Sequence, residues 1–108
     1  VTKGLSIGLS DGTAKVIIPP NSKVPIEEET MLHNPVEANR LTLDLYQGDS
    51  GLSANNSYIG TLTYDYGEMK APYTGVVMVT VSVATSGVVS LSCKELGKPA
   101  VTKELVVT

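Results

Sequence analysis

The sequence contains no phenylalanine and no tryptophan, and it has one cysteine and one histidine among its 108 residues. Its core must therefore be built from Val, Leu and Ile with help from five tyrosines, a composition that favours strands. A single cysteine cannot form an internal disulfide, whereas a sandwich in an oxidising compartment usually carries a pair. We therefore expect a reducing, cytoplasmic location.

Strong charge and long apolar runs are also missing. The net charge of -3, from 11 acidic and 8 basic residues, provides no basic surface for a phosphate backbone. No apolar run approaches the roughly 20 residues that a membrane-spanning helix needs, and the first residues do not resemble a signal peptide. We expect neither a nucleic-acid nor a membrane partner.

Catalytic and metal-binding motifs are scarce. His33 follows Leu32 at the end of an apolar segment, where a structural or solvent-exposed role is the simplest interpretation. Cys93 alternates with Leu91 and Val89, as expected of a small buried hydrophobic residue rather than a nucleophile. The sequence has no glycine-rich phosphate loop, no calcium loop, and no Cys or His metal spacing. We expect a non-enzymatic chain with no catalytic residue, metal or cofactor of its own.

Short alternating segments separated by Gly, Pro, Asn, Asp and Ser recur about every ten residues. In the clearest segment Leu41, Leu43 and Leu45 share one face while polar residues share the other, as in a half-buried strand. Comparable patterns predict strands at residues 5–9, 15–18, 26–32, 40–47, 58–64, 77–83, 88–93 and 101–107, with connections at 47–57 and 65–72. About eight antiparallel strands at this length indicate one all-β domain over residues 1–108, either two packed sheets or a small barrel.

Six short segments, taken in order, carry a resemblance to a known family. They read Leu-Ser-Ile-Gly-Leu at 5–9, Asn-Ser-Lys-Val-Pro at 21–25, Gln-Gly-Asp at 47–49, Asn-Ser-Tyr-Ile-Gly at 56–60, Ala-Pro-Tyr-Thr-Gly at 71–75 and Gly-Val-Val-Ser-Leu-Ser-Cys-Lys-Glu at 87–95. Together they resemble the peptide-binding domain of DnaK-type, seventy-kilodalton heat-shock chaperones over nearly the whole chain. The loops at 10–12 and after residue 35 are shorter than in that family, and its bulky arch residues have no clear counterpart here.

The resemblance implies a two-layer antiparallel β-sandwich whose loops hold an extended apolar peptide of an unfolded protein. Its apolar pocket would be formed by Leu9, Leu32, Leu41, Leu43 and Val79. Backbone groups at Ser10, His33 and Asn34 would meet the peptide backbone. Asp11 at the rim, with the acidic run at 27–29, would favour peptides flanked by Lys or Arg, although such a run is more often a solvated face.

The family also implies parts that these 108 residues do not contain. A full chaperone of this type carries an ATPase domain before this segment and a helical lid after it, so we expect an excised domain or a piece of a larger chain. ATP would act only on that nucleotide-binding domain, and a J-domain co-chaperone and a nucleotide-exchange factor would be partners of the parent protein. Self-association is a further hypothesis, because Glu104 to Thr108 is an extended apolar segment that the groove of a second copy could accept.

Two other classes of function remain open. An immunoglobulin-like sandwich with a structural or adhesive role would explain the strands equally well, although the chain has no paired cysteines with an intervening tryptophan. An enzyme is the third alternative.

Overall fold

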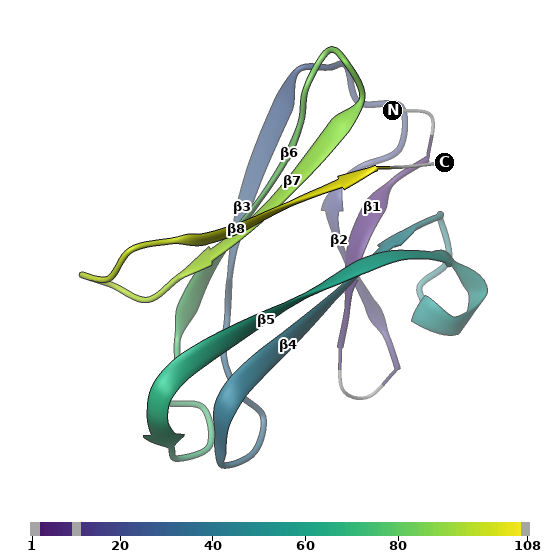
Figure 1. The fold of residues 1–108 in the computed structure, drawn as a ribbon. Helices are drawn as coiled ribbons and strands as arrows, with labels where there is room; N and C mark the ends of the chain where they lie inside the picture. The colour runs from purple at the N-terminus through teal and green to yellow at the C-terminus, as the bar shows by residue number, and fades with distance from the viewer. Residues whose placement is uncertain (1–2, 10–11, 107–108) are drawn as a thin grey trace.

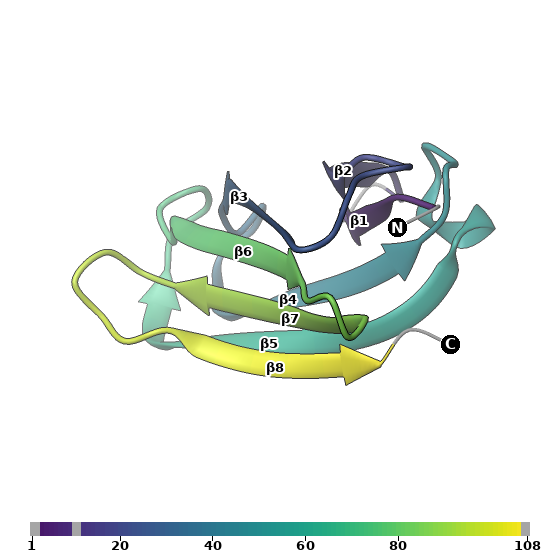
Figure 2. The ribbon, with the colours of Figure 1, turned by 90° about the horizontal axis from the view of Figure 1, so that it is seen from above.

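The computed structural model describes residues 3–9 and 12–106, and this part of the chain is an all-β sandwich (Figure 1). Two four-stranded antiparallel sheets, with strand orders β2-β1-β4-β5 and β3-β6-β7-β8, pack face to face (Figure 2). The sandwich alternative is therefore confirmed over the barrel. The elements are β1 (Leu5–Gly8), β2 (Ala14–Ile18), β3 (Ile26–Leu32), β4 (Ala38–Gln47), a 3₁₀ turn (Ser53–Asn55), β5 (Ser57–Lys70), β6 (Val77–Val83), β7 (Val88–Lys94) and β8 (Val101–Val106).

Alternating side chains from both sheets form one aliphatic core between the layers. On β6 every second residue is buried while the residues between them are partly exposed, as the period of two predicts. The opposite layer contributes the leucine face of β4 and the apolar residues of β1. The buried cluster consists of Leu5, Ile7, Ile17, Ile18, Leu41, Leu43, Leu45, Leu62, Tyr64, Tyr66, Val77, Val79, Val81, Val83, Val89, Leu91, Cys93 and Leu105.

One strand is much longer than the sequence pattern predicts. Residues 65–72 were expected to form a connection, but β5 continues to Lys70. The turn signal is real, since Gly67 has a φ of +78° and its N–H donates to the Asp65 carboxylate at 2.8 Å. It produces an irregularity in the β4–β5 register rather than an end to the strand. Tyr66 stays buried, and its hydroxyl donates to the Gly75 carbonyl at 2.7 Å.

The strands of the first sheet differ in length, and this difference leaves part of β4 without a neighbour. The β1–β4 register runs only from Leu5 opposite Gln47 to Gly8 opposite Asp44, whereas β4 pairs with β5 back to Ala38. The first half of β4 therefore has β5 on one side, and no other strand of the described chain borders it on the other side.

Candidate functional site

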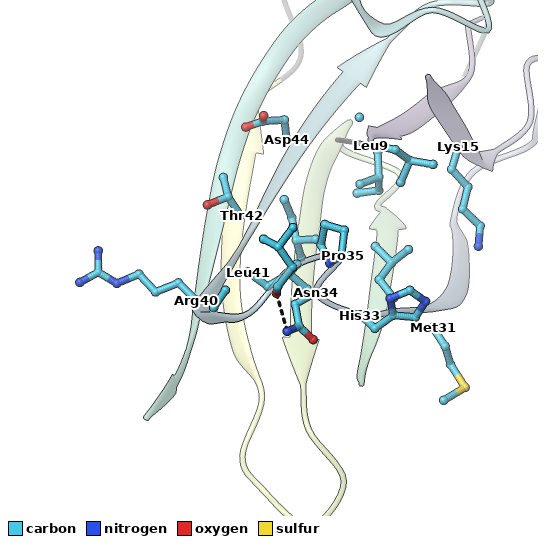
Figure 3. Close-up of a pocket in the computed structure, with 16 residues that line it drawn as sticks. Leu9, Lys15, Met31, His33, Asn34, Pro35, Arg40, Leu41, Thr42 and Asp44 are labelled. Atoms are coloured by element: carbon cyan, nitrogen blue, oxygen red, sulfur yellow. Dashed lines mark hydrogen bonds between the residues drawn. The ribbon is translucent and has the colours of Figure 1, made fainter. Parts of the chain in front are cut away.

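A groove of about 570 Å³ lies beside this first half of β4, and sixteen of the described residues line it (Figure 3). Its floor is apolar and nearly closed to solvent, because Ile7, Leu41 and Leu43 belong to the core. Its walls are more open: the side chain of Leu9 is 38% exposed, and Met31 at the end of β3 is 59% exposed. The volume falls in the range of about 300–1,000 Å³ typical of ligand sites.

Backbone hydrogen bonds show which groups of β4 face the groove. The N–H of Gly48 donates to the Gly4 carbonyl at 3.0 Å, so the backbone of Gly48 faces β1. In an antiparallel pair every second residue faces the same neighbour, which directs Tyr46 and Asp44 to β1 as well.

The same alternation directs the backbone N–H and C=O of Thr42 and Arg40 to that side, beyond the last β1–β4 pair. Leu9 does not pair with β4, since its own N–H and C=O are bonded to Thr13 and Gly12 within the β1–β2 connection. Among the described residues, β4 therefore presents a strand edge to the groove, with its leucines toward the floor and the side chains of Arg40 and Thr42 on the outer face.

The lower wall of the groove, residues 33–36, is held by Asn34. Its side chain is fully buried, and Nδ2 donates to the carbonyls of Val36, Lys70 and Ala71 at 2.8, 3.1 and 3.0 Å. The Asn34 carbonyl also accepts from the N–H of Tyr73 at 2.8 Å. Next to it, the ring of His33 packs edge-on against Tyr73 with centroids 5.1 Å apart. These contacts attach the β3–β4 connection to the end of β5.

The structure brings six of the predicted site residues together and separates Val79 from them. The six that line the groove are Leu9, Leu32, His33, Asn34, Leu41 and Leu43. Val79 lies elsewhere: it is fully buried in the middle of the second sheet, between β3 and β7, and does not line the groove. The structure does not support direct contact between Val79 and a ligand in the groove. The alternating pattern to which Val79 belongs reflects burial in the core. Ser10 and Asp11 lie outside the described residues.

Sequence reasoning missed the charged and edge residues of the groove. Lys15, Arg40, Thr42 and Asp44 line it, and none of them stands out in the sequence from the polar face of an ordinary strand. The acidic run at 27–29, which was expected at the rim, is exposed on β3 and is not part of the lining.

A second polar cluster lies around Glu95, which is buried after the end of β7. Its Oε1 accepts from the Tyr64 hydroxyl at 3.0 Å and lies 3.3 Å from Nζ of Lys98, while Oε2 lies 3.7 Å from Nζ of Lys70. Burial, followed by the hydrogen bond to Glu95, raises the pKa of Tyr64. The partners of the Glu95 carboxylate are Tyr64 and Lys70 of β5 and Lys98 of the β7–β8 connection. This cluster therefore ties β5 to the β7–β8 connection.

Cys93 is fully buried, as its alternation predicts. Burial, reinforced by the negative charge of Glu95, raises the pKa of its thiol to about 12. The thiol therefore stays protonated at neutral pH, where only a thiolate would be an effective nucleophile.

Residues 3–9 and 12–106 contain neither a metal-binding cluster nor a long apolar helix. No group of three or more His, Cys, Asp or Glu side chains there could hold a metal ion. No helix in this part of the protein has the length and apolar character needed to cross a membrane. Comparison with known proteins gives no match, either to a protein-family model or to a curated protein sequence.

Proposed function

We propose that this chain is a peptide-binding module that holds an extended apolar segment of an unfolded protein, in the manner of the substrate-binding sandwich of seventy-kilodalton heat-shock chaperones. The observation that carries the proposal is the groove itself, in which an apolar floor lies directly beside the strand edge of β4.

An extended peptide suits such a site for two reasons. Its backbone can pair with the N–H and C=O groups that Thr42 and Arg40 direct toward the groove, which gives affinity without reading the sequence. Its side chains alternate, so every second one can enter the apolar floor formed by Leu41 and Leu43. Selection would then depend mainly on apolar character, as required for many different clients.

The ordered sequence resemblance supports the same proposal. Segment 5–9 forms β1 and the groove wall at Leu9, and segment 71–75 contains the groups that hold Asn34. Under this proposal the parent protein is cytoplasmic, ATP acts on its nucleotide-binding domain, and a J-domain co-chaperone and a nucleotide-exchange factor serve that parent. Under the same proposal, this chain binds peptide without turnover.

Fluorescence polarisation with a short labelled peptide of Leu and Val tests the proposal. We expect saturable binding at about micromolar strength with rapid exchange, because an open groove offers nothing to slow departure. Leu9→Asp should weaken binding by about tenfold or more, since it places a carboxylate in an apolar wall. Val16→Asp is the matched control: Val16 is similarly exposed on β2 but does not line the groove, so affinity should not change.

Absence of saturable binding, or dissociation lasting many minutes, would contradict the proposal. The first result would favour the structural or adhesive alternative. Melting curves of both variants ensure that the comparison is made between folded proteins.

A further inference from the structure

Two cations flank the groove on opposite sides. Lys15 lies on β2 at one wall and Arg40 on β4 at the other (Figure 3). Both side chains are exposed, and within the described chain neither takes part in an ion pair. Their positions follow from the register: Lys15 is opposite Ile7 and shares its groove-facing side, whereas Arg40 lies on the outer face of β4.

The described lining contains one carboxylate, that of Asp44, and a neighbour already engages it. The Thr61 hydroxyl donates to Asp44 Oδ1 at 2.6 Å and also contacts the Tyr58 hydroxyl on the outer face of β5. The described lining therefore carries one net positive charge, although the whole chain carries -3.

A peptide paired with the β4 edge would expose its side chains to both cations. The residue that follows an anchor in the floor points to the outer face, where it becomes a cross-strand neighbour of Arg40. A peptide residue near the opposite wall of the groove, at β2, approaches Lys15. Opposite charges in such cross-strand positions are favourable, and like charges are unfavourable.

We propose that the groove selects extended apolar segments that carry acidic residues next to the apolar anchor. This inference rests on the proposed function and names the class of peptide that the site takes. It reverses the preference for Lys and Arg expected from Asp11 and the acidic run at 27–29, because that run does not line the groove and Asp11 lies outside the described residues.

Three labelled peptides with one Leu-Val core and flanks of Asp, Ser or Lys test the inference. The Asp peptide should bind about three- to tenfold more tightly than the Lys peptide at low salt, with the Ser peptide between them. The difference should shrink at about 0.5 M salt, where charges at exposed positions are screened.

Charge variants identify the groups responsible. Arg40→Gln and Lys15→Gln should each reduce the ratio of Asp-peptide affinity to Ser-peptide affinity by about two- to threefold. Arg40→Glu should shift the preference toward the Lys peptide, a result that mere loss of packing would not produce. Lys94→Gln, on the exposed side of β7, is the control and should change nothing.

The outcomes separate this inference from the proposed function. Saturable binding of the Ser peptide, with equal or tighter binding of the Lys peptide, overturns the charge preference and leaves the peptide-binding function standing. Failure of all three peptides to bind overturns both.

Discussion

The side-chain oxygen of Asn34 accepts a hydrogen bond from the backbone N–H of Gly75 at 2.9 Å, joining the β3–β4 connection to the β5–β6 connection. With the three carbonyls that its Nδ2 meets, Asn34 supplies polar partners to four backbone groups from a position without solvent access. Asn34 therefore holds the lower wall of the groove in position from its buried side.

Replacing Asn34 by Ala should lower the free energy of unfolding by about 2–4 kcal/mol, because the buried N–H of Gly75 and three partly buried carbonyls lose their partner. Urea denaturation measures the change. Asn55→Ala is the control, since its exposed amide makes one long contact with Ser50 at 3.5 Å and its loss should cost less than about 0.5 kcal/mol. Equal midpoints for wild type and Asn34→Ala would show that the side chain does not organise the wall.

Leu41 and Leu91 provide a comparison between the groove and the core. Leu41 lies in the groove floor and is 9% exposed, whereas Leu91 on β7 is fully enclosed. Leu41→Phe can relax toward the groove, so it should weaken peptide binding by about 1–3 kcal/mol with a smaller loss of stability. Leu91→Phe has no such space and should lower the melting temperature instead.

Melting curves and peptide titrations of the two variants separate these effects. If Leu41→Phe melts as early as Leu91→Phe and its folded fraction binds normally, the floor has been assigned to the wrong residues.

Much of the fold could be predicted from alternation alone. The leucine face of β4 and the valine face of β6 each point to one side of a sheet, and β6 begins and ends where the pattern predicts. The continuation of β5 could not be predicted, because Asp65 and Gly67 form a true turn contact within the strand. Only tertiary packing of Tyr66 and its bond to Gly75 reveal that the strand continues.

The groove was predictable only in part. Its leucines followed from the resemblance, but alternation does not distinguish Leu43, which lines the groove, from Val79, which lies in the other layer. The role of Arg40 depends on the point at which the pairing of β1 with β4 ends. The hydrogen bonds of the β1–β2 connection determine that point. That relationship joins segments far apart in the chain, and no local pattern records it.

Stability should fall at alkaline pH because Cys93, Tyr66 and Tyr64 hold buried protons whose pKa is raised. Burial raises the pKa of Cys93 from 9.0 to about 12 and that of Tyr66 from 10.0 to about 12. Between these values the unfolded chain has released protons that the folded chain retains, so rising pH favours unfolding. Each group should lower the free energy of unfolding by up to about 1.4 kcal/mol per pH unit between its ordinary pKa and its raised pKa. Below its ordinary pKa it should have no effect. Urea midpoints measured from about pH 8 upward test this expectation.

Cys93→Ala isolates the thiol in this experiment. The variant should be less stable at every pH because of the cavity it creates, but its stability should fall less steeply above about pH 9. Parallel curves for the variant and the wild type would show that Cys93 does not cause the alkaline loss.

Tyr64→Phe should lower the free energy of unfolding by about 1–2 kcal/mol, because it removes the hydroxyl that donates to the buried Glu95 carboxylate at 3.0 Å. The carboxylate would keep Lys98 and Lys70, at 3.3 and 3.7 Å, so the fold should survive the change. Tyr58→Phe is the matched control: its hydroxyl meets Thr61 at an exposed site, where water replaces a lost bond, and the cost should stay within about 0.5 kcal/mol. Urea denaturation of the two variants under identical conditions gives the difference. Equal losses of unfolding free energy would mean that the buried Tyr64 hydroxyl contributes no more to stability than a surface hydroxyl does. The two lysines alone would then satisfy the Glu95 carboxylate.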